Sequence, residues 1–599
     1  MQKHLELVQS MTQPKLEASN PWLVSGILRT QLQNVLYNKD QFKEIDEEFK
    51  DFGKFCNEVL YEFSVDAELN PPKLIKQDVY GNVVDKLVLG EGWKKEKEYA
   101  AKCGIVAMAY ENKYGIWNRL IQLLRLQLYQ PVSGLFGCPL AMTDGAAYLL
   151  KQWLTNPTTQ CQETLKLVRQ GFENLTSRDP SKFWTSGQWM TEKDGGSDVS
   201  NSTTTIAIHQ GGNKYKLYGY KWFSSATDSE MTLALARIVP EKNIEDFKKY
   251  PLSLFIMRVK KDDGSLNNIR IMTMKDKMGT RQLPTAELLL QGSEAFLISE
   301  EGKGIKGISH MLNVTRLYNA SSAIGSMNRL YSIVVNYSLK RKAFGQVLIE
   351  KPAHQAMLTK FNLNVRACSL FYFKVAQLFS KIQNNVASKD DEEMFRILTP
   401  LLKLYTAKIC MYWMSEGIEA LGALGYMENS YIPLMLRDAQ VLTIWEGTTN
   451  VLCLDFLRAL KSNDKNDPLQ KLDVYARFHT HVMMTQLSAD TQLPETRKTF
   501  IPYIAKMTIN HNGVIAELSN ILQGSIKYSE MRIRDLCFIL CESFVGGQML
   551  ELISKNGREE DIISFELWVE QMQSYTTTWS ITPKAFDILV KENIIKSKL

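Results

Sequence analysis

The hydrophobic spacing of the sequence changes twice along the chain, and this limits the possible folds more than any other feature. Up to about Phe183 the apolar residues mainly recur at helical spacing, as in "FKEIDEEFKDFGKFCNEVLYEF". From about Trp184 short alternating runs are separated by turn residues, and from about Ile305 to Leu460 long helical patterns return. Because no helical pattern lies between the alternating runs, we expect a largely antiparallel sheet, not a doubly wound parallel fold.

These changes divide the chain into four predicted regions of an α+β multidomain protein. They are an N-terminal helical domain (1–183), a β domain (184–304), a second helical domain (305–460) and a helical appendix (461–599). The appendix opens with the polar linker "KSNDKNDP". In the β domain, Gly211-Gly212-Asn213 separates two alternating runs and predicts a β-hairpin.

Charge and cysteine content argue against several classes of protein. The net charge is +6 over 599 residues, which is too small to indicate a nucleic-acid or membrane partner. The nine cysteines contain no C-x-x-C pair, which predicts reduced intracellular thiols and no zinc or other metal site. No apolar run reaches about 18 residues, so we expect no membrane span, and the N-terminus lacks the features of a signal or transit peptide.

The last three residues, Ser597-Lys598-Leu599, match the C-terminal peroxisomal address. The alternative is a chance ending of a solvated, lysine-rich tail, and the cytoplasm or the mitochondrion then becomes the expected compartment. Three specified residues at a fixed position favour the peroxisome.

One glycine pattern is misleading. "GKGIKG" has the form G-x-G-x-x-G at Gly302, Gly304 and Gly307, between a strand-like segment and a helical one. No Asp or Glu lies between Ser309 and Leu348 to bind a ribose, and the preceding strands do not belong to a βαβ unit. We interpret the stretch as a connection from strand to helix and not as a dinucleotide site.

Four other stretches have residues suited to chemistry, each with a plainer alternative. "MTEKDGGSDV" combines a tight glycine turn with hydroxyls, which suits an anionic ligand or simply a polar turn. "KWFSS" offers an aromatic ring beside a hydroxyl, or a core aromatic beside a solvated serine pair. "RKAFG" is a possible phosphate grip or a basic helix end. "RDAQVLTIWEGTTN" places one carboxylate, Glu446, beside tryptophan, after a possible Arg437–Asp438 ion pair.

Taken together, these stretches resemble the acyl-CoA dehydrogenase family. "TEKDGGSDV", "KWFSS", "KMGTRQLPTAEL", "GISHMLNVTR", "RKAFG", "GALGY" and "RDAQVLTIWEGTTN" have the family's order and approximate spacing, over roughly residues 15 to 460. The helical appendix and the wording "IWEGTTNVLCLDFLRAL" resemble the AidB-like branch. The joint match is specific, whereas none of the single motifs is.

The resemblance implies non-covalently bound FAD, a fatty acyl-CoA ligand and a homotetramer built as a dimer of dimers. It places one group of residues beside the flavin, a second group on FAD across a subunit interface, and a third group at the acyl-CoA. The first group is Met190, Thr191, Gly196, Ser197, Trp222, Phe223, Ser224, Thr448 and Asn450; the second is Arg341, Phe344, Glu419 and Gly422; the third is Ser197, Asn313, Arg316 and Glu446. Pro352 stands where many relatives have a flavin-contacting glutamine.

The same resemblance makes Glu446 the catalytic base that removes the α-proton of an acyl thioester. Apolar surroundings that exclude water raise the pKa of a carboxylate and strengthen it as a base. Some branches carry the base on an earlier helix, next to the arginine of "NVTR", but this chain has Thr315 there, and threonine cannot serve as that base. Glu446 is the remaining candidate.

Several functions remain open at this point. The first is an FAD-dependent acyl-CoA dehydrogenase, and the second a slow or non-catalytic protein that binds and sequesters acyl-CoA on the same fold. An acyl-CoA oxidase would suit a peroxisome, although the β-domain motif favours a dehydrogenase. The AidB-like branch raises DNA association, but residues 461–599 contain 16 Lys+Arg and 17 Asp+Glu, a net charge of −1, which argues against strong nucleic-acid binding. The sequence identifies neither the electron acceptor nor the acyl chain length.

Overall fold

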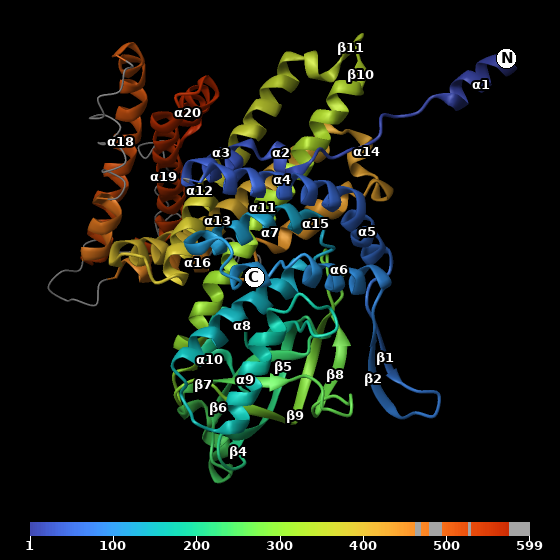
Figure 1. Ribbon diagram of the computed structural model, residues 1–599, viewed down its shortest axis with the longest axis vertical. Helices are drawn as coiled ribbons and strands as arrows, with labels where there is room; N and C mark the ends of the chain where they lie inside the picture. Colours follow the sequence, from blue (N-terminus) through green and yellow to red (C-terminus); the bar gives the residue numbers. More distant parts are fainter. Residues whose placement is uncertain (37, 462–468, 478–493, 525–528, 574–599) are drawn as a thin grey trace, which may run out of the picture.

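The computed structural model describes residues 1–36, 38–461, 469–477, 494–524 and 529–573. A bundle of long helices forms one part, a β domain lies against one end of it, and a further group of helices lies beside it (Figure 1). This arrangement confirms the α+β multidomain class. The terminal Ser597-Lys598-Leu599 lies outside the described residues.

The first part of the chain is helical, as predicted, with one exception. Its helices are α1 (Gln2–Ser10), α2 (Pro21–Val24), α3 (Gly26–Val35), α4 (Lys39–Phe55), η1 (Cys56–Leu60), α5 (Tyr61–Leu69), α6 (Glu91–Lys102), η2 (Ala107–Ala109), η3 (Gly115–Trp117), α7 (Asn118–Tyr129), η4 (Gln130–Val132), α8 (Gly137–Thr155) and α9 (Gln162–Leu175). The exception is a two-stranded hairpin of β1 (Lys73–Gln77) and β2 (Val83–Val88), which the sequence analysis missed.

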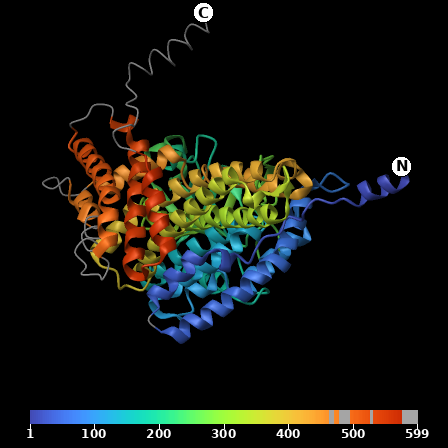
Figure 2. The same cartoon turned by 90° about the horizontal axis from the view of Figure 1, so that it is seen from above.

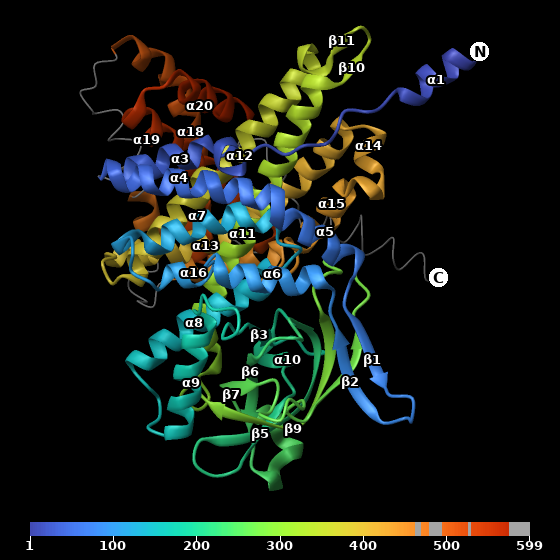
Figure 3. The same ribbon diagram turned by 45° about the vertical axis from the view of Figure 1, so that its right-hand side comes forward.

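This hairpin ties the helical region to the β domain. It extends beside β8 (Ile269–Met274), as Figures 1 and 3 both show. Asp85 of β2 is buried, pairs with Lys76 on β1, and accepts a 2.7 Å hydrogen bond from Arg270 Nε on β8. Because most residues of the two strands are exposed, their apolar pattern is weak and gives little strand signal.

The β domain contains a seven-stranded sheet that closes on itself. Its remaining strands are β3 (Ser186–Trp189), β4 (Ile206–His209), β5 (Lys214–Ser225), β6 (Met231–Ile238), β7 (Leu252–Arg258) and β9 (Thr285–Leu297); the helices α10 (Val199–Ser202) and η5 (Glu241–Lys249) interrupt them. The order is β3-β6-β4-β5-β9-β7, with β8 on β9 and a further pairing of β6 with β7.

Most pairs in this sheet are antiparallel, as predicted. The predicted hairpin at Gly211 joins β4 to β5, with His209 opposite Tyr215. The prediction was incomplete at β6, however, because this strand pairs in parallel with both β3 and β4. β3 pairs with Met231–Ala234 of β6 and β4 with Arg237 and Ile238, while β7 pairs antiparallel with Met231–Arg237.

The second helical region is built on three long helices. It contains α11 (Gly304–Lys340), β10 (Lys342–Ala343), β11 (Gln346–Val347), η6 (Leu348–Glu350), α12 (Pro352–Gln383), α13 (Lys389–Ala420), α14 (Ala423–Tyr426), η7 (Glu428–Ser430), α15 (Ile432–Val441) and α16 (Thr449–Leu460). The "GKGIKG" stretch is the start of α11, in agreement with its interpretation as a connection from strand to helix.

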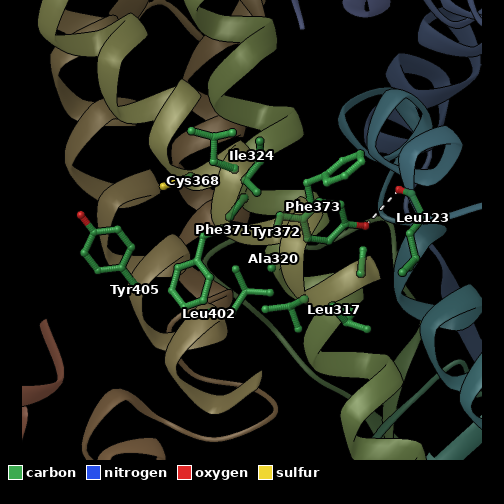
Figure 4. Close-up of a cluster of buried hydrophobic side chains, with 14 of the residues drawn as sticks. Leu123, Leu317, Ala320, Ile324, Cys368, Phe371, Tyr372, Phe373, Leu402 and Tyr405 are labelled. Carbon is green, nitrogen blue, oxygen red and sulfur yellow. Dashed lines mark hydrogen bonds between the residues drawn. The ribbon is translucent and has the colours of Figure 1, made fainter. Parts of the chain in front are cut away.

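Close packing of α7, α11, α12 and α13 forms the core of the bundle (Figure 4). Leu317, Phe371 and Leu402 are fully buried or nearly so, and they face one another across α11, α12 and α13. Tyr372 is also buried, and its hydroxyl donates a 3.0 Å hydrogen bond to the carbonyl of Leu123 on α7. The buried hydroxyl is thus satisfied, and the bond fixes α12 against α7.

The appendix packs against the side of this bundle (Figure 2). Its helices are α18 (Pro494–Leu522), η8 (Ser529–Met531), α19 (Ile533–Asn556) and α20 (Glu559–Gln571). Within the described part of the chain, α19 is long and apolar enough to cross a membrane, but 83% of its most apolar window is buried against other parts of the protein. The apolar surface of α19 is therefore explained by packing against its neighbours.

Candidate active site

Glu446 lies in a tight turn between α15 and α16. Its φ is +57° and that of Gly447 is +106°, so two successive residues have left-handed or related backbone angles. A non-glycine residue with positive φ costs energy unless its surroundings hold it there. The turn therefore gives the Glu446 carboxylate a fixed direction that an ordinary helix end would not provide.

The carboxylate of Glu446 is enclosed by residues from other helices. Thr315 Oγ1 on α11 donates a 2.6 Å hydrogen bond to Glu446 Oε2. Loss of water raises the pKa of Glu446, and the Thr315 hydrogen bond and the positive charges of Arg316 and Lys403 oppose this rise. A carboxylate tuned in this way is suited to accept a proton from a bound ligand.

Trp445, the residue before Glu446, is also held by α11. Trp445 Nε1 donates a 2.5 Å hydrogen bond to Asn319 Oδ1, one helical turn after Thr315. Thr315 and Asn319 thus hold two successive residues of the turn from one face of α11. The sequence predicted that Thr315 is not the base, and here it serves as a hydrogen-bond donor to the predicted base.

Lys403 is a site residue that the sequence analysis did not find. Its side chain on α13 is fully buried, and Nζ donates a 2.7 Å hydrogen bond to the carbonyl of Gly447. Burial lowers the pKa of Lys403 to about 7, and the Glu446 carboxylate opposes this fall. A single lysine inside the apolar run "TPLLKLYTA" was the available signal, because such a residue is rarely buried without a specific partner.

We expect Lys403→Met to slow the reaction at Glu446 by about tenfold near pH 7, the equivalent of roughly one pKa unit. Loss of the ammonium group raises the pKa of Glu446 further. As the pH is lowered, the variant should therefore lose activity at a higher pH than the unaltered protein. The check is the rate of proton removal from the bound ligand between pH 6 and 9. Lys403→Arg should restore most of the rate, and Lys408→Met on the same helix should leave the profile unchanged. An unshifted acidic limb in Lys403→Met contradicts the assignment.

Arg316, which the resemblance places at the acyl-CoA, forms an ion pair within the protein. Instead of being free to meet a ligand, its guanidinium forms a 2.8 Å ion pair with Asp455 on α16. Arg316 Nε is nevertheless buried and has no hydrogen-bond partner among the described residues. Arg316 therefore joins α11 to α16 beside Glu446, and Asn313 lies half-buried one turn earlier on the same helix. Asp455 is a second residue that sequence reasoning missed.

The residues expected at the flavin meet where β5 ends. Trp222 and Phe223 are partly exposed, with 36% and 42% of their surface accessible, whereas Ser224 is fully buried. Ser224 Oγ has no hydrogen-bond partner in the part of the chain that the structure describes. A buried hydroxyl without an acceptor is costly, so these residues fit a site that a ligand with a hydrogen-bond acceptor and a flat ring completes.

The glycine turn of "TEKDGGSDV" is fixed beside this strand end by a buried ion pair. Lys221 Nζ, on β5, lies 2.6 Å from Glu192 Oε1, and both side chains are almost inaccessible to water. Backbone Trp222 N–H also donates a 2.9 Å hydrogen bond to the carbonyl of Thr191. Met190 is buried, while Gly196 and Ser197 are exposed on the turn. The two motifs predicted to form one binding face are thus joined directly.

The residues expected to reach FAD across a subunit interface lie at the opposite end of the molecule. Arg341 and Phe344 belong to the β10–β11 tip that joins α11 to α12, and Phe344 is 98% exposed. Glu419 and Gly422 are exposed where α13 ends and α14 begins. Figures 1 and 3 both place the tip far from the β domain, so within one copy these residues do not share a ligand with Trp222.

The structure also locates Thr448 and Asn450, and it tests the suggested Arg437–Asp438 ion pair. Thr448 is exposed beside Glu446, but Asn450 Oδ1 accepts a 3.0 Å hydrogen bond from Arg534 on α19 of the appendix. The suggested Arg437–Asp438 ion pair is wrong. Arg437 instead pairs with Glu428 at 2.6 Å, and Asp438 accepts a 2.5 Å hydrogen bond from the backbone N–H of Thr280 in the β domain.

Comparison with known proteins gives consistent matches. The family model for the acyl-CoA dehydrogenase C-terminal domain matches residues 302–461, and that for the middle domain matches residues 187–293. The chain is 41% identical to acyl-CoA dehydrogenase family member 11 of Caenorhabditis elegans over 76% of this chain and 72% of the relative. It is 30% identical to the putative acyl-CoA dehydrogenase AidB of Escherichia coli over 66% and 70% of the two chains. The crystal structure of C. elegans ACDH-11 in complex with C11-CoA is similar with a TM-score of 0.87, 33% identity, and coverage of 98% of this chain and 96% of that one.

Proposed function

Because the chain belongs to the acyl-CoA dehydrogenase family, we propose that it oxidises a fatty acyl-CoA to the trans-2-enoyl-CoA with Glu446 as the catalytic base. The observation that carries the proposal is the Glu446 turn. Its carboxylate is enclosed, has a raised pKa, and is directed by Thr315, Trp445 and Lys403. Such an arrangement is a general base prepared for a proton from a neighbouring ligand.

In the proposed reaction Glu446 takes the α-proton and becomes a carboxylic acid. Enclosure of the carboxylate makes it a stronger proton acceptor than a carboxylate in water, while the nearby cations keep enough of it ionised. FAD, the cofactor of this family, supplies the acceptor for the hydride that leaves the β-carbon, so that the product gains one double bond. Trp222 and Ser224 would hold the ring system, and the turn at Gly196 and Ser197 would border it.

The ligand class follows from the family and from one solved relative. C. elegans ACDH-11 binds C11-CoA, which supports a fatty acyl-CoA of similar length as ligand here. Arg316, already paired with Asp455 beside Glu446, would neighbour the thioester end of the acyl chain. A protein that binds acyl-CoA without turning it over would use the same residues, so the experiment must observe the chemical step.

Two further proposals concern assembly and location. The β10–β11 tip that carries Phe344 lies far from the β domain that carries Trp222 (Figure 1), which supports an assembly in which the tip of one copy completes the FAD site of another, as in a dimer of dimers. Ser597-Lys598-Leu599 supports a peroxisomal location, to be tested by imaging an N-terminally tagged chain with and without Leu599. A diffuse pattern for the intact tail would reject that address.

The test of the function is anaerobic mixing of FAD-loaded protein with dodecanoyl-CoA. We expect the flavin absorbance to bleach and one equivalent of 2-enoyl-CoA to form, because the base and the hydride acceptor act on the same bond. Mass spectrometry of the thioester identifies the product. Tight binding of dodecanoyl-CoA without bleaching would show that the chain is an acyl-CoA binder and would reject the dehydrogenase proposal.

A further inference from the structure

A separate cavity of about 80 Å³ lies between α5, η4, α11 and α15. On the scale of about 30 Å³ per water molecule, this volume holds two or three waters or a group of similar size. Figure 3 shows α5 and α15 on the same side of the bundle, with α11 running through its centre. The polar residues of its wall include Ser322, Ser326, Arg329 and Asp438, although it lies between packed helices where apolar walls are usual.

Two helices lead from Glu446 to this cavity. On α11, Thr315 and Asn319 contact Glu446 and Trp445, and Ser322 and Ser326 continue the same face into the cavity wall. Ser322 and Ser326 lie seven and eleven residues after Thr315. At ~1.5 Å per residue this is about 10 to 16 Å of helix, the reach of an extended chain of roughly eight to twelve carbons.

The second helix is α15, which ends just before the Glu446 turn. Ala439 on this helix and Leu442 immediately after it line the same cavity, seven and four residues before Glu446, respectively. The cavity therefore lies along both segments that position the base. An acyl chain whose thioester end lies at Glu446 would reach the cavity by running along this face of α11.

Arg329 is the feature that distinguishes this cavity from an ordinary apolar tail pocket. Its guanidinium stacks over the Tyr61 ring at 4.2 Å and Nη1 donates a 2.8 Å hydrogen bond to Asn57 Oδ1. Arg329 forms no ion pair with any carboxylate of the described residues. The side chain is half-buried, and loss of water lowers the pKa of Arg329. A partly buried positive charge without a counter-charge is unfavourable, and a bound anion would relieve it.

Asp438 is the acid in the cavity wall, and it does not neutralise Arg329. Its Oδ1 accepts the backbone N–H of Thr280 in the β domain, which turns the carboxyl toward that domain. Burial raises the pKa of Asp438 to about 7, with the Thr280 hydrogen bond opposing the rise, so the carboxyl is largely protonated in mildly acidic solution. The hydroxyls of Ser322 and Ser326 supply further hydrogen-bond donors in the wall of the same cavity.

We propose that this cavity binds the far end of an acyl-CoA whose chain carries a terminal carboxylate, that is, the mono-CoA thioester of a medium-chain dicarboxylic acid. The inference rests on the proposed function, because it places the thioester end of the same ligand at Glu446. Arg329 pairs with the terminal carboxylate, and the two serines donate hydrogen bonds to it. Oxidation at the α and β carbons is unchanged, and the cavity determines which acyl chain is preferred.

The experiment compares three CoA thioesters on the full-length, FAD-loaded protein. The probes are dodecanoyl-CoA, the mono-CoA thioester of dodecanedioic acid, and 12-hydroxydodecanoyl-CoA, and each dissociation constant is measured by calorimetry. We expect the dicarboxylic thioester to bind about ten to a hundred times more tightly than dodecanoyl-CoA, the usual worth of a hydrogen bond to a charged group. Arg329→Gln should abolish that ratio and leave dodecanoyl-CoA binding unchanged. The matched control is Arg396→Gln, an exposed arginine on α13.

A second variant keeps the test decisive if Arg329→Gln fails to fold. Ser326→Leu fills the cavity with apolar atoms, so it should weaken binding of the dicarboxylic thioester more than that of dodecanoyl-CoA. Equal affinities for the first two probes on the unaltered protein overturn the inference, as does a preference for the 12-hydroxy chain. Bleaching by dodecanoyl-CoA in those cases still supports the dehydrogenase. A carboxylate preference without bleaching by any probe supports the cavity and rejects the dehydrogenase.

Discussion

Glu446→Gln should slow flavin reduction by an acyl-CoA by on the order of 10²–10⁴, the usual contribution of a general base. The amide has nearly the same size as the carboxylate, and Thr315 Oγ1 can still donate its hydrogen bond to the remaining amide oxygen. Only the ability to accept the α-proton is lost. Stopped-flow absorbance after anaerobic mixing with dodecanoyl-CoA measures the rate, and calorimetry measures the affinity, which should change little.

The control for this variant is Glu245→Gln, which removes an exposed carboxylate in η5 of the β domain. It should reduce its flavin at the rate of the unaltered protein. A rate for Glu446→Gln within a factor of two of the parent would show that another group removes the proton. Because burial raises the pKa of Glu446, the parent should also lose activity as the pH falls through that raised value, and Glu446→Gln should show no such limb.

Local patterns predicted several strands of the β domain and one of its turns. The runs "MTLALARIV" and "IRIMTM" became β6 and β8, and the Gly211 turn joins β4 to β5. These segments are bounded by turn residues and bury one face, so their period is visible in a single sequence. The parallel pairing of β6 with β3 was not predictable in this way, because it depends on which strands become neighbours after the chain has folded.

The residues around Glu446 were also only partly predictable from the sequence. Family motifs indicated Glu446 and Thr315, and the structure brings them within 2.6 Å. The same motifs gave no sign of Lys403 or Asp455, because each lies inside a regular helical pattern and meets its partner only through tertiary packing. A buried charge needs a partner, and that partner lies 44 residues from Lys403. Sequence reasoning therefore identified the candidate base but not the charged residues that change its pKa.

The largest stability effect is expected from Asp144→Asn. Arg119 on α7 and Asp144 on α8 form an ion pair in which both side chains are fully inaccessible to water. Asp144 also accepts hydrogen bonds of 2.7 Å from the Tyr110 hydroxyl and 2.8 Å from the Tyr318 hydroxyl on α11. Removal of one charge leaves the Arg119 guanidinium buried and unpaired, so the free energy of unfolding should fall by about 3–5 kcal/mol. Urea denaturation followed by circular dichroism measures the change.

The matched variants separate the cost of an unpaired charge from the value of the pair. In Arg119→Met with Asp144→Leu both charges are replaced by apolar groups, and the loss of stability should be much smaller than in Asp144→Asn alone. Glu300→Gln, which breaks an exposed pair with Lys303, should leave the unfolding midpoint nearly unchanged. If the double variant is as unstable as Asp144→Asn, the hydrogen bonds from Tyr110 and Tyr318 hold the network, and not the ion pair. Tyr318 lies two residues after Arg316, so the same network fixes the part of α11 that carries Thr315 to the base.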